Sequence, residues 1–176
     1  GGIKAGFGYA ESQLASGVTI AAAVVVNAVG SAVDPTTGRL WADHMQSLAS
    51  PAHSEREALA AAYAQAQAPL ATTIGVVLTD AVLSKAQASK LAAVAHDGMA
   101  RAIRPIHSMV DGDTVFCLAS SRRPLAEDPM RSLFDFNTLL AAAADVLAEA
   151  CLDAMLAAKE RGSWKSYTDI APSVLS

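Results

Sequence analysis

The segment Ala71-Thr72-Thr73-Ile74-Gly75-Val76-Val77-Leu78-Thr79 sets two threonines directly before a run of β-branched and apolar residues. This run predicts a strand over residues 72–79, because β-branched side chains favour extended backbone. A similar run, residues 17–29, contains Asn27 near its end and predicts a strand buried on both faces. A third strand is predicted over residues 114–119. The chain therefore offers three buried strands from which a sheet can form.

Two helices are predicted around these strands from their start signals and composition. Ser54 begins an S-x-x-E capping box, which predicts a helix that runs to about Gln67 and is closed by Pro69. A second, longer helix is predicted over residues 138–159, where alanine and leucine dominate. Strands and helices thus alternate along the chain.

A third helix has the clearest amphipathic pattern. Ser84 and Gln87 again form a capping box, and Pro105 is expected to end the helix. One apolar face is formed by residues four apart, namely Leu91, Ala95, Met99 and Ile103. Glycine-rich residues 1–8 and the tail, residues 164–176, are predicted to be irregular.

Composition narrows the class of protein. The chain has 176 residues, of which 52% are hydrophobic and 17% charged, and this fits one folded domain rather than a disordered segment. The net charge of −4 gives no electrostatic reason to expect a nucleic-acid partner. No stretch reaches the roughly 18 uninterrupted apolar residues of a membrane span. We therefore expect neither nucleic acid nor membrane as a partner.

Cysteine and histidine usage indicates the compartment and the absence of metal chemistry. Cys117 and Cys151 each lie in an apolar run, which is typical of core residues in a reducing compartment, so we expect a cytoplasmic protein. The four histidines are scattered and no C-x-x-C pair occurs, so the sequence predicts no metal site and no cofactor. Because the chain begins with Gly1 rather than Met, we expect the native N-terminus to lie elsewhere.

Polar groups at the strand ends are the candidates for chemistry. They are Thr72 and Thr73, the pair Asp111 and Asp113, and Asn27. Side chains at strand ends can project from a rigid scaffold into a cleft. Taken singly, each has an ordinary structural explanation, since threonine favours strands and Asp-Gly-Asp is common in turns. Pattern and spacing alone leave a layered α/β or α+β domain without an assigned function.

Phrases spread over nearly the whole chain form one pattern. They are Gly1-Gly2-Ile3-Lys4-Ala5-Gly6-Phe7-Gly8, Val24-Val25-Val26-Asn27-Ala28-Val29-Gly30, Thr72-Thr73-Ile74-Gly75-Val76-Val77, Ala95-His96-Asp97-Gly98-Met99-Ala100-Arg101-Ala102-Ile103-Arg104-Pro105, His107 and Asp111-Gly112-Asp113-Thr114-Val115-Phe116. In order and spacing they resemble the DmpA-type aminopeptidases, whose relatives include β-peptidyl aminopeptidases, pantetheine hydrolase and nylon-oligomer hydrolase. The resemblance implies an α+β fold, a four-layer αββα sandwich of the DmpA/ornithine acetyltransferase type, seen here as its C-terminal half.

The resemblance also implies a self-cleaving precursor. Cleavage between Ala71 and Thr72 would make residues 1–71 the C-terminal part of an α-chain and residues 72–176 a β-chain within one domain. Thr72 would then be an N-terminal nucleophile. A free α-amine titrates near pH 7.7–8.0 and can take the hydroxyl proton of its own residue, which an amide nitrogen inside the chain cannot do. Family precursors are about twice this length, so we expect the missing N-terminal half as a partner.

Further roles follow from the same resemblance. Asp111 and Asp113 match the pair that orients the nucleophile and moves protons, and two carboxylates this close can raise one another's pKa. Asn27 matches an amide that donates to the developing oxyanion. Lys4 is expected near the cleft, as a candidate substrate or junction contact. Thr73 is expected to be structural.

The residue before the nucleophile departs from the family pattern. Family members usually carry Asn there, whereas this chain has Ala71, whose side chain cannot hydrogen-bond. We therefore expect cleavage to be slowed or blocked, either by an engineered change or by natural divergence.

The expected function is a self-processing amide hydrolase of the aminopeptidase type that acts through an acyl-Thr72 intermediate on a small amide or peptide substrate. Two alternatives stay open: an acyltransferase of the ornithine acetyltransferase type, and an inactive structural homologue. By resemblance we expect a homo-oligomer, a tetramer or larger.

Overall fold

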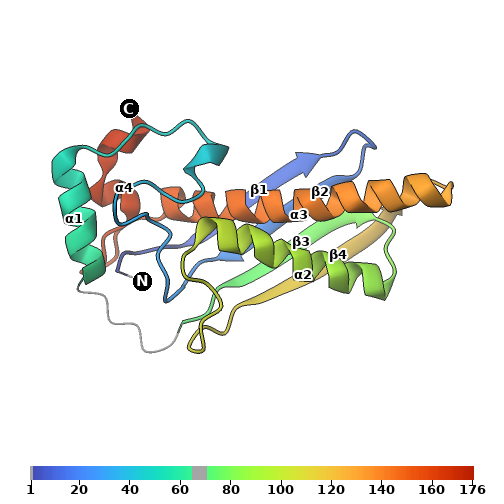
Figure 1. Cartoon of the computed structure of the whole chain (residues 1–176), viewed down its shortest axis with the longest axis horizontal. Helices are drawn as coiled ribbons and strands as arrows, with labels where there is room; N and C mark the ends of the chain where they lie inside the picture. Colours follow the sequence, from blue (N-terminus) through green and yellow to red (C-terminus); the bar gives the residue numbers. More distant parts are fainter. Residues whose placement is uncertain (1, 65–70) are drawn as a thin grey trace.

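The sheet of the molecule joins strands from the first and the second half of the sequence (Figure 1). The computed structural model describes residues 2–64 and 71–176. The strands are β1 (Phe7–Gln13), β2 (Thr19–Val25), β3 (Ile74–Ala81) and β4 (Thr114–Arg123). They lie in the order β1-β2-β3-β4, with the first two pairs antiparallel and β3 parallel to β4. The parallel pair is connected through a helix, as parallel strands require.

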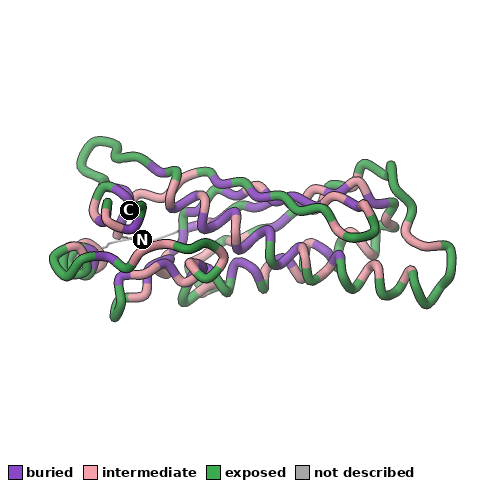
Figure 2. Tube along the Cα trace, turned by 90° about the horizontal axis from the view of Figure 1, so that it is seen from above, coloured by how far each residue is buried: buried purple, intermediate pink, exposed green. Residues whose placement is uncertain are grey.

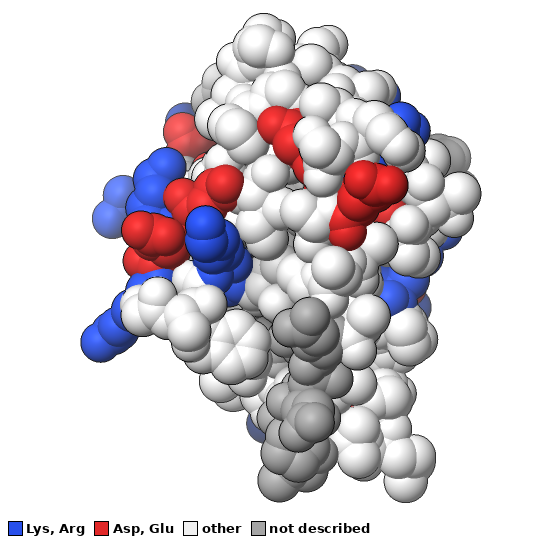
Figure 3. Space-filling view, turned by 90° about the vertical axis from the view of Figure 1, so that its left-hand side faces the viewer, with Lys and Arg blue, Asp and Glu red and all other residues white. Residues whose placement is uncertain are grey.

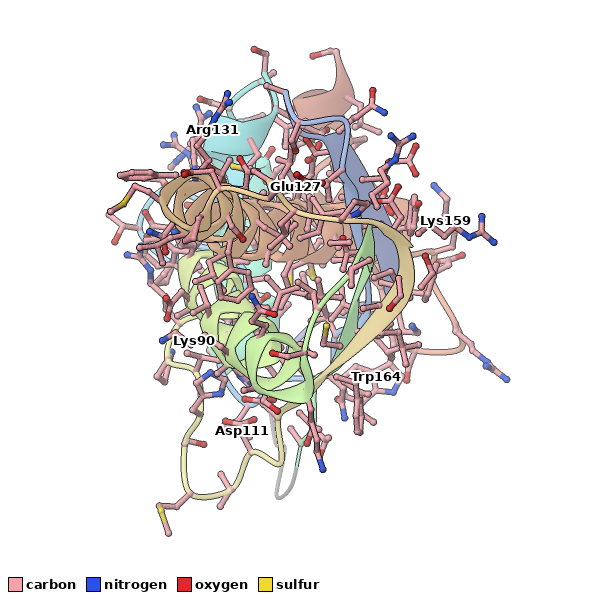
Figure 4. The ribbon with its side chains drawn as sticks, turned by 90° about the vertical axis from the view of Figure 1, so that its right-hand side faces the viewer. Lys90, Asp111, Glu127, Arg131, Lys159 and Trp164 are labelled. Carbon is pink, nitrogen blue, oxygen red and sulfur yellow. The ribbon has the colours of Figure 1, made fainter. Side chains whose placement is uncertain are left out.

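Two helices cover one face of this sheet. They are α2 (Lys85–Ala102) and α3 (Pro129–Ala157). The helix α3 contacts β1 and β2, α2 contacts β4, and the two helices contact each other. Figure 4 shows both on the same side of the sheet. This mixed sheet with a helical layer confirms the predicted α+β class, and the described residues supply one sheet layer and one helix layer.

The shorter elements gather at the end of the molecule that holds both chain termini (Figure 1). They are α1 (His53–Ala64), α4 (Tyr167–Ile170) and the 3-10 turns η1 (Asp43–Met45) and η2 (Pro172–Leu175). Acidic and basic side chains are mixed on this end (Figure 3). Among the described residues, no helix combines the length and the apolar character that crossing a bilayer requires.

The hydrophobic core lies between the sheet and the two helices. Buried positions run along the middle of the molecule, whereas loops and helix ends are exposed (Figure 2). The strands β2 and β3 contribute Ile20, Val24 and Val77 to the core, and α3 contributes Leu147. On the other face of the sheet, large apolar side chains are exposed: Phe7, Tyr9, Val25, Ile74, Phe116 and Leu118. The predicted burial of residues 17–29 on both faces holds at Ile20, Ala21 and Ala22 but not at the end of β2, where Val25 is half exposed because the helices cover one face only.

The helix that begins after Ser84 confirms its prediction in detail. The Ser84 hydroxyl accepts from the Gln87 backbone N–H, and the Gln87 side chain accepts from the Ser84 N–H. The predicted face is fully buried, with Leu91, Ala95, Met99 and Ile103 all inaccessible to solvent. The last helical residue is Ala102, three positions before Pro105. Local start and stop signals agree with the tertiary packing here.

Other boundaries differ from prediction. Residues 7–13 form β1, although the glycines nearby suggested a loop. A Cβ atom on Gly8 would lie 2.0 Å from the carbonyl oxygen of Ala150. This glycine therefore lets a strand pass close to α3, and does not mark a turn. The tail is also more ordered than predicted, since Ser166 and Asp169 form a capping box at the start of α4.

Two helices, α1 and α3, begin earlier than predicted, because residues other than the predicted ones cap them. The helix α1 begins at His53, so Ser54 lies inside the helix and is not its predicted N-cap, and the Glu55 carboxylate accepts from the Ala52 N–H at 2.8 Å. The helix α3 begins at Pro129 rather than residue 138, because Asp128 accepts from the Arg131 N–H and proline is favoured at the first helical position. The predicted end of the first helix at Gln67 and its closure by Pro69 lie outside the described residues.

Candidate functional site

The predicted candidate groups meet at one edge of the sheet. Because β3 is parallel to β4, the residues before these two strands lie at the same edge, and an isolated parallel bridge joins Ala71 to Asp111. Because β2 runs antiparallel to β3, the residues after β2 reach that edge too, which brings Asn27 there. Figure 4 places Asp111 in the loop between α2 and β4, below α2. Topology thus assembles groups that are far apart in sequence.

Thr72 is held between backbone groups from two neighbouring segments. Its N–H donates to the carbonyl of Asn27 at 2.8 Å, and its hydroxyl donates to the carbonyl of Ala71 at 2.7 Å. The N–H of Gly112 donates to the same Ala71 carbonyl at 2.9 Å. A Cβ atom on Gly112 would stand 2.8 Å from the Thr72 hydroxyl oxygen, so glycine allows the loop to approach this closely. The hydroxyl therefore lies beside a carbonyl that is already polarised by a second donor.

Asp113 contacts the residue that follows Thr72. Its Oδ1 accepts from the Thr73 N–H at 2.8 Å, and its Oδ2 accepts from His107 Nδ1 at 2.9 Å and from the His107 N–H at 3.3 Å. The Asp113 side chain is only 1% exposed. A buried carboxylate needs such donors, since burial without hydrogen bonds strongly disfavours the charge. Asp113 therefore links the backbone at Thr73 to His107.

Asp111 is bound from two sides. Its Oδ1 accepts from the Val29 N–H at 3.0 Å, and its Oδ2 accepts from the Ser108 hydroxyl at 2.6 Å. Burial raises the pKa of Asp111, but the hydrogen bonds from Ser108 and Val29 lower it by a larger amount, so the pKa lies below its ordinary value. The expectation that the neighbouring carboxylates raise one another's pKa is therefore wrong for Asp111. This group is an anion and a structural anchor.

Asn27 and Thr73 occupy opposite environments. Asn27 is exposed, and its backbone N–H donates to the Thr73 hydroxyl at 3.4 Å. No hydrogen bond links its side-chain amide to another described residue, so the amide can face a ligand. Thr73 is fully buried. These environments agree with an amide available for an oxyanion at Asn27 and with a structural part for Thr73.

Lys4 lies on a different segment, paired with Ser166 in an isolated bridge. Its ammonium donates to the carbonyl of Ala5, and its backbone N–H donates to the carbonyl of Lys165 at 2.8 Å. Its contact with the junction or a substrate stays a prediction.

Three side chains at this edge were not assigned a role from sequence: His96, His107 and Ser108. The ring of His107 contacts Asp113, and His96 Nδ1 lies 3.2 Å from His107 Nε2. Ser108 holds Asp111. His96 and His107 stand in phrases that carry the family resemblance, but the sequence predicts no role for them, and Ser108 has no signal at all, because a hydrogen bond across a loop leaves no periodic pattern. Within residues 2–64 and 71–176, no cluster of histidine, cysteine and carboxylate side chains could hold a metal ion.

Comparison with known proteins adds a family. The model of peptidase family S58 matches residues 1–167. An uncharacterized aminopeptidase of Mycobacterium tuberculosis is 42% identical over 188 residues, which cover 98% of this chain and 54% of that protein.

Solved structures agree in fold. A β-aminopeptidase of Burkholderia sp. superposes with a TM-score of 0.62 at 21% identity, over 99% of this chain and 48% of that one. The L-aminopeptidase D-Ala-esterase/amidase of Ochrobactrum anthropi, described as a variant of the Ntn hydrolase fold, has a TM-score of 0.59 at 22% identity, over 92% of this chain and 43% of that one. The chain thus spans about half the length of the proteins it matches.

Proposed function

The chain belongs to peptidase family S58, and we propose that it is about half of a self-processing amide hydrolase whose nucleophile is Thr72. One observation carries this proposal: the Thr72 hydroxyl lies 2.7 Å from the carbonyl oxygen of Ala71, which also accepts from Gly112. The aminopeptidase names among its relatives support a hydrolase rather than an acyltransferase.

The first proposed reaction is self-cleavage. The Thr72 oxygen attacks the Ala71 carbonyl carbon, its proton passes to the Thr72 nitrogen, and the C–N bond breaks to leave an ester and a free α-amine. Water then hydrolyses the ester and releases the Ala71 carboxylate. The Gly112 N–H, 2.9 Å from the carbonyl oxygen, is the donor that would stabilise the negative charge formed there.

The second proposed reaction is hydrolysis of a small amide or peptide. The free Thr72 amine takes the proton of its own hydroxyl, and the oxygen forms an acyl ester as the substrate amine leaves with a proton. Asn27 would donate to the substrate oxyanion. Asp113 holds the segment through the Thr73 N–H, and Asp111 holds the segment after Asn27 through the Val29 N–H. Water attack on the ester then frees Thr72.

A further part of the proposal is that the rest of the same precursor covers the open face of the sheet. That face exposes 61% of Phe7, 57% of Phe116 and 61% of Leu118, and apolar area buried there would contribute about 25 cal/mol per Å². The length ratio to the relatives supports such a partner. The homo-oligomer and the cytoplasmic location stay predictions.

Intact-mass analysis of the full-length protein tests the nucleophile. We expect slow or no cleavage with Ala71, faster cleavage in Ala71→Asn, and none in Ala71→Asn combined with Thr72→Ala. The double variant Ala71→Asn with Thr72→Ser is the matched control, because it keeps a hydroxyl and should still cleave. Rapid, complete cleavage before Thr72 in the unaltered protein would remove the idea of a blocked precursor.

Activity is the second measurement. Chromogenic amino-acid amides should be hydrolysed by cleaved Ala71→Asn protein and not by its Thr72→Ala counterpart. A cleaved chain that hydrolyses none of a broad amide panel would favour the inactive structural homologue.

A further inference from the structure

Two histidines and an aspartate form a continuous hydrogen-bonded chain beside the proposed nucleophile. His96 Nδ1 lies 3.2 Å from His107 Nε2, and His107 Nδ1 lies 2.9 Å from Asp113 Oδ2. The other oxygen of Asp113 accepts from the Thr73 N–H at 2.8 Å. The chain therefore runs from α2 to the residue directly after Thr72.

His107 supplies Asp113 with two donors. Besides Nδ1, its backbone N–H donates to the same Oδ2 at 3.3 Å. This double contact depends on the backbone of His107, which has a φ of +58° in the left-handed region. Few residues other than glycine, asparagine, aspartate and histidine adopt this region readily. Backbone and side chain are thus both directed at one buried oxygen.

His96 holds the His107 ring on its far side. The ring centroids are 4.7 Å apart in an edge-on arrangement with an interplanar angle of 66°. His107 is 39% exposed at its side chain while Asp113 is 1% exposed. Without His96, the exposed ring would be free to turn away from the carboxylate.

We propose that His107 is the positioning residue of Asp113 for the reaction of Thr72, and that His96 fixes the His107 ring. This inference rests on the proposed function and deepens it, since among the described residues the Asp113 carboxylate hydrogen-bonds the N–H of Thr73, the residue directly after Thr72. His107 touches no reacting atom. It acts by keeping the carboxylate correctly placed.

The pair can take up one proton without losing a hydrogen bond. With both rings neutral, His107 Nδ1–H donates to Asp113 and His107 Nε2 accepts from His96 Nδ1–H. With one added proton, His107 donates from both nitrogens and His96 Nδ1 becomes the acceptor, its proton now on Nε2.

Protonation of this pair would affect the basicity of the Thr72 amine. A cation beside Asp113 would offset the carboxylate charge that favours a proton on the Thr72 amine, so the amine would be a weaker base. Protonation of the pair should therefore lower activity.

Other ionisable groups near the pair set its environment. Burial and the neighbouring His107 lower the pKa of His96 more than Asp113 and Asp97 raise it, so this pKa lies below its ordinary value. Asp111 also interacts with His107. From α3, Cys151 interacts with Asp113, and burial raises the pKa of this thiol to about 12, so it stays neutral.

Two substitutions of His107 separate positioning from general stability. His107→Asn keeps a donor close to the place of Nδ1 and tolerates the left-handed backbone, whereas His107→Ala removes the donor. In the full-length Ala71→Asn protein, we expect His107→Ala to lose about 10- to 100-fold in kcat/KM, as when the hydrogen-bond partner that orients a metal ligand is removed. His107→Asn should recover most of this loss. His53→Asn, at the exposed start of α1, is the matched control.

The pH profile of kcat/KM gives a readout that a merely structural role would not move. The parent should show an extra fall toward acid pH, at values below the ordinary imidazole pKa of about 6.5, because the pKa of His96 is lowered by its burial. His107→Asn should lack this fall. Equal activity of the parent and His107→Ala, or equal loss in His107→Ala and His107→Asn, would overturn the inference.

NMR of the Thr72→Ala protein tests the same link without catalysis. In His107→Ala, the pKa of His96 should rise, because the mutation reduces the burial of this ring and removes the electrostatic effect of His107, both of which lower this pKa. The Thr73 amide proton should also exchange faster, and His107→Asn should preserve its protection. Unchanged Thr73 exchange in His107→Ala would overturn the inference. If the His96 pKa and the Thr73 exchange change as expected but the protein hydrolyses no amide, the proposed function alone is contradicted.

Discussion

The two faces of the sheet differ sharply although they are made by the same strands. Toward α2 and α3, the strands present Ile20, Val24 and Val77, which are inaccessible or nearly so. Toward the other side, they present Phe116 and Leu118, which are more than half exposed. Alternation of side chains along a strand produces both faces. Only one of them has a partner among the described residues.

The chain therefore carries more apolar surface than its own described residues cover. Contiguous exposed apolar side chains on a sheet mark an interaction surface rather than ordinary scattered exposure. The proposed site lies at the edge where β2, β3 and β4 meet, so whatever covers the open face would also lie beside Thr72. Completion of the fold and completion of the site are therefore linked.

The largest loss of stability is expected from a substitution on the face of the sheet that α2 and α3 cover. Leu147 on α3 is fully buried, and its Cδ1 lies 3.3 Å from where a Cβ of Gly75 would stand. Leu147→Ala in the full-length protein should lower the free energy of unfolding by about 3 kcal/mol, since it leaves a cavity against the sheet. Denaturant unfolding measures this. A loss below about 1 kcal/mol would mean that the interface between helices and sheet repacks easily.

We expect substitutions on the open face of the sheet to destabilise the full-length protein as substitutions in a hydrophobic core do. Leu118 and Leu175 are equally exposed here, at 61% and 62%. If the rest of the precursor covers the sheet, Leu118→Ala in the full-length protein should cost about 2 kcal/mol. Leu175→Ala, at the chain end and away from the sheet, is the matched control and should cost less than about 0.5 kcal/mol. Equal costs for the two leucines would mean that the face stays open to solvent.

The smallest expected effect is a pH-dependent change in stability at Asp111, which lies at the edge of the sheet that holds the proposed site. The pKa of Asp111 is lower in the folded protein than in the unfolded chain, because burial, which raises it, is outweighed by the hydrogen bonds from Ser108 and Val29. Its stabilisation is therefore present above about pH 4, the unfolded value, and is lost as pH falls through the folded pKa. The stability difference between wild type and Asp111→Asn should shrink over that window. A difference that stays constant from neutral pH down through the folded pKa would contradict this assignment.

Local signals in the sequence predicted much of the helix after Ser84 and placed β3 and β4 to within a few residues. These signals failed where a residue is required for close packing rather than for a turn. Gly8 indicated a loop, but its lack of a side chain lets β1 pass close to α3. They also missed His107, whose contact with Asp113 spans a loop in an unusual backbone conformation.

The candidate groups and the order of β2, β3, β4 and the three long helices could be predicted from local patterns, since capping boxes, β-branched runs and strand-end polar residues are local properties; β1 could not. The resemblance singled out Thr72, Asp111, Asp113 and Asn27 together. That the starts of β3 and β4 and the end of β2 share one edge is visible only in the folded chain, because parallel and antiparallel pairing is a long-range property. The tertiary structure also decided which face of the sheet is covered, since the same alternating strand can bury either side until a helix packs against one of them.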